Sequence, residues 1–180
     1  DDGFHFERFI NSAKLFDHIF TVDINKLEAY KSFCKATKTF DVLKFAVNPK
    51  IHFPQKIKRQ NRICFLGSYY KNQHIERSKF QKFAFDNLAG YGLDIYDRNH
   101  KRKSKNFSFP KKYQKYLIKG VKHIKTADIY NKYLATLNVN TVTDSPTMFS
   151  RRMLEAMACK SLVLTNNSLA TEKYFRECVI

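Results

Sequence analysis

The stretch that decides the fold begins Arg62-Ile63-Cys64-Phe65-Leu66-Gly67-Ser68. An apolar run of strand length ends there at a glycine and a serine. A helix is expected next, from about Ile75 to Leu88, with Ile75, Phe80, Phe83 and Leu88 on its buried face. Ala89-Gly90-Tyr91-Gly92 predicts the end of that helix and a turn, and Leu93 to Asp97 predicts a second strand. Short apolar strands that alternate with helices are typical of a buried parallel sheet.

The same alternation continues to the end of the chain. The residues Ile129, Tyr130, Tyr133 and Leu134 mark a short helix, and residues 135–139 a third strand. Residues 149–158 are expected to be helical, residues 162–165 to form a fourth strand, and residues 171–178 to begin another helix. The connections are long enough for right-handed crossovers, so residues 62–180 predict Rossmann-like α/β layers built on a parallel sheet.

Upstream of residue 62 the pattern is similar but shorter. Residues 4–20 have the spacing of an amphipathic helix, and Ile19 to Val22 predicts a short strand. Asp23 is expected in a turn or at an N-cap before a helix through Leu27, Tyr30 and Phe33. Val42 to Val47 predicts another strand, and residues 52–60 are the best candidate for a linker. We therefore expect residues 1–55 to end one α/β domain and residues 56–180 to begin a second.

Composition excludes several classes of protein. Of 180 residues, 43% are hydrophobic and 27% charged, which is too apolar for a disordered chain. No apolar run approaches the roughly 20 residues that span a bilayer, and no secretory signal is evident. Residue 1 is Asp, so the chain is expected to be an internal fragment of a longer one. These features favour a cytoplasmic location.

The net charge is +17, from 33 basic and 16 acidic residues. Nine of the basic residues are Arg and 33 − 9 = 24 are Lys. Lys, Asn, Ile, Phe and Tyr are abundant together, as an AT-rich coding sequence would give, so local clustering must support any functional argument. The cysteines Cys34, Cys64, Cys159 and Cys178 and the six histidines show no zinc-ligand spacing, so no metal is expected.

Ligands of open parallel sheets bind at the carboxyl ends of the strands. One loop there begins Gly67-Ser68-Tyr69, where a glycine allows close backbone approach and a helix N-terminus follows. A second is Asp97-Arg98-Asn99, where base- or ribose-reading groups often lie. A plain strand-ending turn would have the same composition, so neither loop is specific alone.

The third loop runs from Asn138 through Asp144 and Ser145 to Glu155. Ser145, Thr147 or Ser150 could cap the following helix. Arg151 and Arg152 fall in its first turn, where cations oppose the helix dipole unless a bound diphosphate reverses the penalty. Glu155 is four residues after Arg151, so the two could instead form a simple ion pair.

With these residues the chain resembles the CgeB-like, spore-maturation-type glycosyltransferases, which are related to the family 1/4-like enzymes of GT-B architecture. The resemblance rests on Asn138 to Asn140, Asp144 to Arg152 and Glu155 to Cys159. It is supported upstream by residues 16–23, 48–52, 65–70 and 93–98. It implies two Rossmann-like domains facing across a cleft, with the nucleotide-sugar donor on the C-terminal one. The chain would then contain an incomplete donor domain.

The resemblance implies roles for individual residues. Glu155 would contact the donor ribose, Arg151 and Arg152 the diphosphate, and Gly67 and Ser68 the phosphate side of the cleft. The wider donor-binding set comprises Gly67, Ser68, Tyr69, Asp97, Arg98, Asn138, Ser145, Thr147, Met148, Arg151, Arg152 and Glu155. Two positions depart from the family pattern. Thr147 stands where a second Glu is common, and Lys160 where a Gly is usual, which keeps an inactive donor domain open as an alternative.

No Asp-x-Asp motif occurs, so the expected reaction is a metal-independent transfer of a sugar from a nucleotide-diphosphate donor. No cofactor is expected, and the acceptor could be a cell-envelope polymer or glycan. No catalytic base is assigned. Asp23 is a candidate by its place at a strand end, although a turn-capping role is the simpler interpretation.

Between Asp97 and Asp128 no acidic residue occurs, while eleven basic residues alternate with Phe107, Phe109, Tyr113 and Tyr116. Three interpretations stay open. The segment could bind single-stranded nucleic acid by phosphate contact and stacking, as a non-enzymatic basic module would. It could dock on an anionic membrane surface or acceptor through residues 98–125. It could also be a solvated, lysine-rich surface.

Overall fold

The computed structural model describes residues 9–102 and 105–180, which form two compact units. The first unit contains residues up to Phe45 together with 142–149 and 168–174, and the second contains 46–141, 150–167 and 175–180. The predicted division of the chain into an acceptor-side domain (1–55) and a donor-side domain (56–180) stays a prediction.

The second unit is built on a parallel sheet of five strands. These are β3 (Gln60–Gly67), β4 (Leu93–Asp97), β5 (Leu117–Lys119), β6 (Tyr133–Asn138) and β7 (Leu162–Thr165), in the order β5-β4-β3-β6-β7. The predicted Rossmann-like α/β fold class is therefore confirmed. β5 was not predicted, because it has only three residues and its apolar pair Leu117-Ile118 is too short a signal in a lysine-rich stretch.

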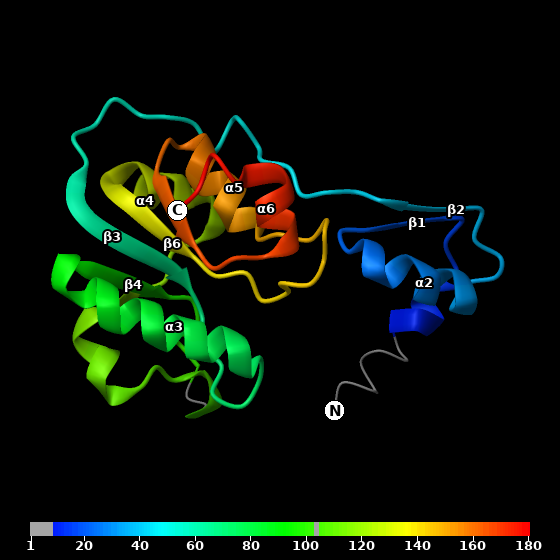
Figure 1. Cartoon of the computed structure of the whole chain (residues 1–180), viewed down its shortest axis with the longest axis horizontal. Coiled ribbons are helices and arrows are strands. Elements are labelled where there is room, and N and C mark those ends of the chain that lie inside the picture. The colour runs from blue at the N-terminus through cyan, green and yellow to red at the C-terminus, as the bar shows by residue number, and fades with distance from the viewer. Residues whose placement is uncertain (1–8, 103–104) are drawn as a thin grey trace. The chain divides into compact units, whose positions relative to one another are not determined.

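Helices cover both faces of this sheet. Figure 1 shows α3 (Ile75–Leu88) on one side and α4 (Thr126–Lys132) and α5 (Arg151–Ala158) on the other. Short 3-10 turns occupy Ala89–Tyr91, Lys105–Phe107, Lys111–Tyr116 and His123–Lys125. Alternate apolar residues of the central strands pack with Phe85, Phe109 and Tyr113 into one core. None of the described helices is long and apolar enough to cross a membrane.

The bounds of α3 match the prediction, and Phe80 and Leu88 of its predicted buried face pack against the core, but the other two residues of that face do not. Ile75 and Phe83 are each 64% exposed, whereas Arg77, Gln81, Ala84 and Phe85 are buried. The polar pair can be buried because the side chains of Arg77 and Gln81 both donate hydrogen bonds to the carbonyl oxygen of Ser68. Hydrogen bonding to the backbone thus overrides the hydrophobic pattern.

Two further element boundaries differ from the predictions. The helix expected to include Tyr133 and Leu134 ends at Lys132, because Tyr133 already pairs with Gln60 as the first residue of β6. The expected linker over residues 52–60 has no helix or strand before Gln60, yet it is anchored. Arg59 donates hydrogen bonds to the carbonyl oxygens of Tyr130, Tyr133 and Cys159.

The first unit contains a smaller parallel pair. The pair consists of β1 (His18–Thr21) and β2 (Thr39–Val42). The unit also contains a 3-10 turn (Ile24–Lys26), α2 (Leu27–Phe33) and most of α6 (Leu169–Phe175). Residues 9–13 are helical, so the helix predicted for 4–20 ends earlier than expected, and residues 4–8 lie outside the described part. The strand predicted at Val42 to Val47 is also misplaced, since pairing with four-residue β1 ends at Val42.

Candidate functional site

The order of the strands reverses between β3 and β6. From β3 the chain proceeds outward through β4 to β5, then returns to place β6 on the other side of β3. In open α/β sheets, ligands bind in the crevice outside the carboxyl ends of the strands at such a reversal. Gly67 ends β3 and Asn138 ends β6, so two of the predicted site residues stand at this place.

Arg77 of α3 joins the two loops that leave these strands. Its Nη1 donates to the carbonyl oxygen of Val139 at 3.0 Å and its Nη2 to that of Ser68 at 3.3 Å. The guanidinium is buried, and its Nε has no hydrogen-bond partner among the described residues. Burial and, next, the charge of Arg152 lower the pKa of Arg77 to about 10. The sequence did not single out this residue.

Arg152 of α5 approaches the same strand end. Its Nη1 donates to the carbonyl oxygen of Leu66, and the guanidinium lies over the ring of Phe65, 5.9 Å from the centroid. Burial lowers the pKa of Arg152. Gly67 has room for no side chain, since a Cβ there would lie 2.6 Å from Nη1 of Arg152 and 2.6 Å from Cζ of Phe65.

None of these cations forms a direct ion pair with a carboxylate of the described residues. No carboxylate in residues 9–102 and 105–180 lies within 4.0 Å of Arg77, Arg98 or Arg152. The charge of Arg98 contributes to lowering the pKa of Arg152, and the backbone N–H of Arg98 donates to the carbonyl oxygen of Gly67. The guanidinium groups of Arg77 and Arg152, held on neutral carbonyl oxygens around a strand end, are suited to an anionic ligand.

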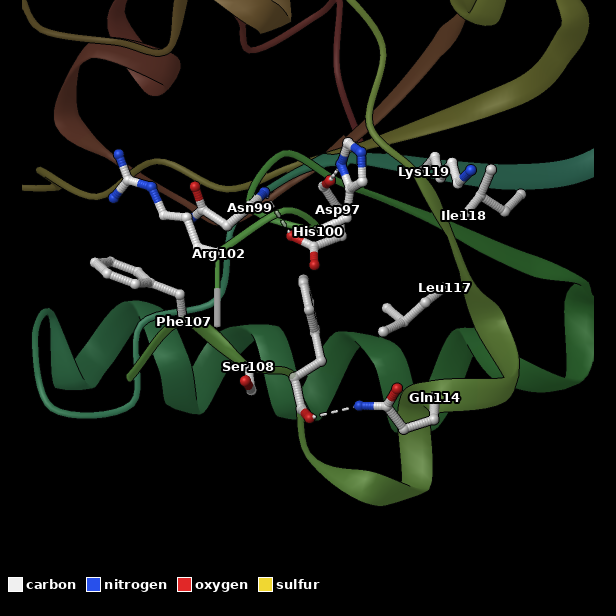
Figure 2. A pocket seen from close by; sticks show the side chains of 11 residues that line it. Asp97, Asn99, His100, Arg102, Phe107, Ser108, Gln114, Leu117, Ile118 and Lys119 are labelled. Atoms are coloured by element: carbon white, nitrogen blue, oxygen red, sulfur yellow. Dashed lines mark hydrogen bonds between the residues drawn. The ribbon is translucent and has the colours of Figure 1, made fainter. Parts of the chain in front are cut away.

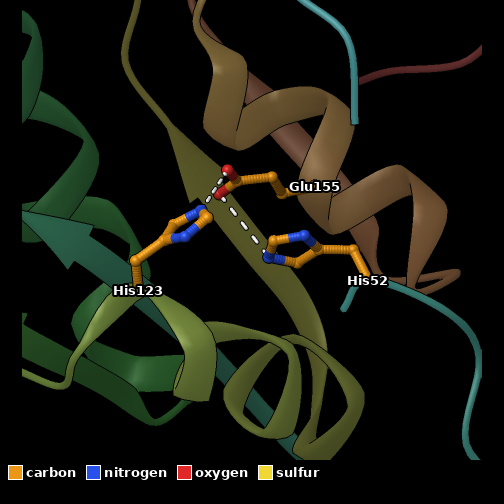
Figure 3. Close-up of side chains that lie close together, drawn as sticks. All are labelled: His52, His123 and Glu155. Atoms are coloured by element: carbon orange, nitrogen blue, oxygen red, sulfur yellow. Dashed lines mark hydrogen bonds and ion pairs between the residues drawn. The ribbon is translucent and has the colours of Figure 1, made fainter. Parts of the chain in front are cut away.

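Glu155 lies at the centre of a second cluster, which Figure 3 shows with His52 and His123. Its Oε1 is 2.8 Å from Nε2 of His123 and 2.9 Å from Nε of Arg151, and its Oε2 is 3.9 Å from Nε2 of His52. The Glu155 side chain is only 3% exposed. The ion pair between Arg151 and Glu155 that the four-residue spacing allowed is present.

His52 is connected to the His123 backbone of this cluster through Thr126. Its Nε2 lies 2.9 Å from Oγ1 of Thr126, and that hydroxyl donates to the carbonyl oxygen of His123 at 2.7 Å. Burial is the largest cause that lowers the pKa of His52, so the neutral imidazole is favoured. Sequence reasoning treated both histidines as isolated, because their proximity arises only from the fold.

His52, His123 and Glu155 also form a set that could ligate a metal ion, since one ligand atom from each lies within 4.8 Å of the others. Two imidazoles and a carboxylate are a ligand set that zinc uses. Here, however, the carboxylate is already paired with the guanidinium of Arg151, and Nε2 of His52 with Thr126. A cation would have to displace both contacts, so we assign the cluster to orientation of Glu155.

Asp97 lines a cavity of about 320 Å³ beside the ends of β4 and β5 (Figure 2). Its Oδ1 accepts a hydrogen bond from the backbone N–H of Asn99 at 2.8 Å, and burial raises the pKa of its carboxyl group. His100, Phe107 and Lys119 contribute other parts of the wall. The cavity is of the size that a small ligand fills.

Asn138 belongs to an amide network that fixes the start of α5. Its Nδ2 donates to Oδ1 of Asn140 and to Oγ1 of Thr165, and Oδ1 of Asn140 accepts from the backbone N–H of Ser150 at 3.0 Å. Ser150 occupies the N-cap position, but its side chain makes no capping bond. The predicted caps from Ser145, Thr147 or Ser150 are therefore wrong, and Asn140 holds the entry to the helix instead.

The remaining predicted site residues serve local structure. In the first unit, Oγ of Ser145 accepts from the N–H groups of Thr147 and Met148. Oγ1 of Thr147 accepts from the N–H of Ile24 and donates to the carbonyl oxygen of Val22.

Asp23 caps the 3-10 turn through the N–H of Asn25, as the simpler interpretation expected. Tyr69 packs against the core, with its ring 5.5 Å from that of Phe109. A donor-binding role for Tyr69, Ser145, Thr147 and Met148 stays a prediction.

Two comparisons with known proteins bear on this site. A family model described as glycosyl transferase-like matches residues 56–179, which include both arginine loops and the whole Glu155 cluster except His52. A search of curated proteins found no match to the chain.

Proposed function

Since the chain belongs to the glycosyl transferase-like family, we propose that it transfers a sugar from a nucleoside-diphosphate donor to an acceptor without a metal ion. The family membership supports glycosyl transfer in general. The nature of the donor and the metal independence are the finer parts of the proposal. CgeB-like enzymes are the subgroup to which we assign the chain, on the sequence motifs given above.

One observation supports a nucleoside-diphosphate donor. Arg77 and Arg152 place a buried and a half-buried guanidinium group near Gly67, and both donate hydrogen bonds to neutral backbone carbonyl oxygens. A diphosphate offers two negative charges and several acceptor oxygens, and guanidinium groups bind such oxygens in pairs. The absence of a side chain at Gly67 would allow the diphosphate to approach the backbone closely.

The proposed chemistry follows from this placement. The bond between the anomeric carbon and the diphosphate oxygen breaks, and its electron pair stays on the diphosphate. The acceptor oxygen forms the new bond and releases its proton. Positive charge fixed at the departing diphosphate stabilises the negative charge that develops on it, as a metal ion would. Glu155, oriented by His123 and Arg151, would accept hydrogen bonds from the ribose hydroxyls.

Calorimetry with a panel of nucleoside diphosphates tests the proposal. We expect at least one to bind, and Arg152→Ala to weaken that binding about 10- to 100-fold, because hydrogen bonds to charged groups contribute roughly 1.5–3 kcal/mol. Lys58→Ala is the control, since Lys58 is exposed and changes the net charge equally. If no nucleoside diphosphate binds the chain, the proposal is wrong.

A second candidate is a donor-binding domain without activity. It is favoured by Thr147, which replaces an acidic residue of the family pattern and whose hydroxyl is engaged by the backbone of Val22 and Ile24. An assay of nucleoside diphosphate release from the sugar donor distinguishes the two candidates, because only an active enzyme hydrolyses the donor or transfers its sugar. Binding without release in the presence of a range of glycan acceptors would support the inactive domain.

A further inference from the structure

The segment from Ile118 to Lys125 repeats one pattern three times. Ile118-Lys119, Val121-Lys122 and Ile124-Lys125 each place an aliphatic residue before a lysine, and consecutive pairs are three residues apart. All six side chains are exposed in the structure. Ile118, Val121 and Ile124 are 37%, 38% and 65% exposed. We call residues 118–125 the aliphatic–lysine segment.

Positive charge in this segment is largely uncompensated. Lys125 lies 3.5 Å from Asp128, but within residues 9–102 and 105–180 no carboxylate is within 4.0 Å of Lys119 or Lys122. Lys111 and Lys115 precede the segment and are also exposed. The segment starts in β5, which is one of the two edge strands of the sheet, and continues into the 3-10 turn at His123–Lys125.

The structure separates two interpretations of this basic region. Binding of single-stranded nucleic acid would require exposed aromatic rings on which bases stack. Phe109 and Tyr113 are instead 3% and 2% exposed, because they belong to the core of the second unit, and Tyr116 is half-buried against that core. Phe107 is half-buried, with its ring in edge contact with that of Tyr70. Apart from His123, the exposed side chains beside the lysines of residues 118–125 are aliphatic. Aliphatic groups enter the interface of a bilayer, while lysines attract its anionic headgroups.

We propose that the aliphatic–lysine segment docks the protein on a membrane surface that contains anionic phospholipid. Lys119 and Lys122 attract the headgroups, and Val121 and Ile124 enter the boundary between headgroups and acyl chains. His123 lies within the segment and bonds Glu155, so docking would bring the candidate site close to acceptors held at the membrane. The docking itself does not depend on the proposed enzymatic activity.

Co-sedimentation with vesicles tests the proposal directly. The chain should bind vesicles of phosphatidylcholine mixed with phosphatidylglycerol, bind vesicles of phosphatidylcholine alone much more weakly, and dissociate as the salt concentration rises. The double variant Lys119→Gln/Lys122→Gln should bind the mixed vesicles about 25-fold more weakly, at about fivefold per lysine. Val121→Ser/Ile124→Ser should also weaken binding while its salt dependence stays close to that of the unaltered chain.

Matched controls lie elsewhere on the surface. Lys35→Gln/Lys50→Gln removes the same charge from other exposed positions, and Ile57→Ser removes an aliphatic side chain that is 48% exposed. Both should bind as the unaltered chain does. Equal binding to the two kinds of vesicle overturns the proposal, as does equal weakening by the controls. Single-stranded DNA that binds well and loses affinity in Lys119→Gln/Lys122→Gln, without any vesicle binding, would show a nucleic-acid surface instead.

Discussion

Nε2 of His123 lies 2.8 Å from Oε1 of Glu155, although the two residues are 32 positions apart. The imidazole comes from the turn after β5, and the carboxylate from the first turns of α5. Arg151 contacts the same oxygen from within α5. The carboxylate is thus held from two directions before any ligand binds, and little side-chain entropy remains to be lost when it accepts a hydrogen bond.

Replacing Glu155 by Gln tests whether this carboxylate binds the donor. The side chain keeps its size but loses its charge, so ribose hydroxyls would donate to a weaker acceptor. We expect the affinity for the best nucleoside diphosphate to fall about 10-fold by calorimetry. Glu76→Gln, at a position whose side chain is 84% exposed, should leave the affinity unchanged. Unchanged affinity in Glu155→Gln, together with a loss in Arg152→Ala, would give Glu155 a structural role only.

Stability should depend on pH through His52. Burial lowers its pKa in the folded chain, so the unfolded chain binds a proton more readily near the ordinary imidazole value of about 6.5. The contribution of this group to stability is therefore present above about pH 6.5 and is lost as the pH falls toward the folded-state pKa. Urea denaturation across this range should show a shallower dependence in His52→Gln than in the unaltered chain. His18→Gln, at an exposed position, should keep the original dependence.

The parallel sheet could be predicted because local signals agree with tertiary structure there. The apolar runs at β3, β4 and β7 are bounded by glycine or polar residues, and each strand formed where expected. The predictions that failed concern features that tertiary contacts determine, such as which side chains of a helix are buried. Arg77 and Gln81 are buried through hydrogen bonds to a carbonyl oxygen thirteen or fewer residues away, and hydrophobic spacing cannot reveal that.

The residues of the candidate site likewise differ in whether a local sequence signal marks them. The places of Gly67 at a strand end and of Arg152 in the first turn of a helix could be predicted from the sequence, whereas a role for Glu155 was implied by the family resemblance, and the donor-binding roles of all three stay predictions. His52 and His123 could not be predicted, because neither has a neighbouring ligand or partner in the sequence. The contact of His52 with Thr126 spans 74 residues and depends on the path of residues 52–59 along the second unit. Clusters that draw on distant loops carry no local sequence signal.

Gly67→Ala should damage both folding and ligand binding. The added Cβ would meet Nη1 of Arg152 and Cζ of Phe65 at 2.6 Å, so the guanidinium and the ring must both move. We expect a loss of about 1–3 kcal/mol in the free energy of unfolding, as overpacking typically costs. Nucleoside diphosphate affinity should fall as well, because Arg152 is displaced.

Gly90→Ala provides the matched control for this substitution. A Cβ at Gly90 would meet no heavy atom within 4 Å, and its φ is not positive. The free energy of unfolding should therefore change by less than about 1 kcal/mol, with a gain expected from the smaller entropy of the unfolded chain. If Gly67→Ala is as harmless as Gly90→Ala, the close approach of Arg152 to the strand end is wrong.

Asp97→Asn should stabilise the protein at neutral pH. Burial raises the pKa of Asp97, so the folded state favours the protonated form, and the contribution to stability falls as the pH rises through the folded-state pKa. Asparagine keeps the oxygen that accepts from Asn99 but carries no charge. We expect a gain of order 1 kcal/mol or less at pH 7 that disappears below about pH 4, measured by urea denaturation.

Asp94→Asn, three residues earlier in β4, should do the opposite. Burial tends to raise the pKa of Asp94, but hydrogen bonds from Arg62 and Tyr133 outweigh it and hold the pKa below its usual value. Its carboxylate therefore stabilises the fold at neutral pH, and that contribution is lost in acid. Opposite signs for two aspartates on one strand would show that Asp97 is kept ionisable at a cost in stability, as expected for a group that serves a ligand in the adjoining cavity rather than the fold.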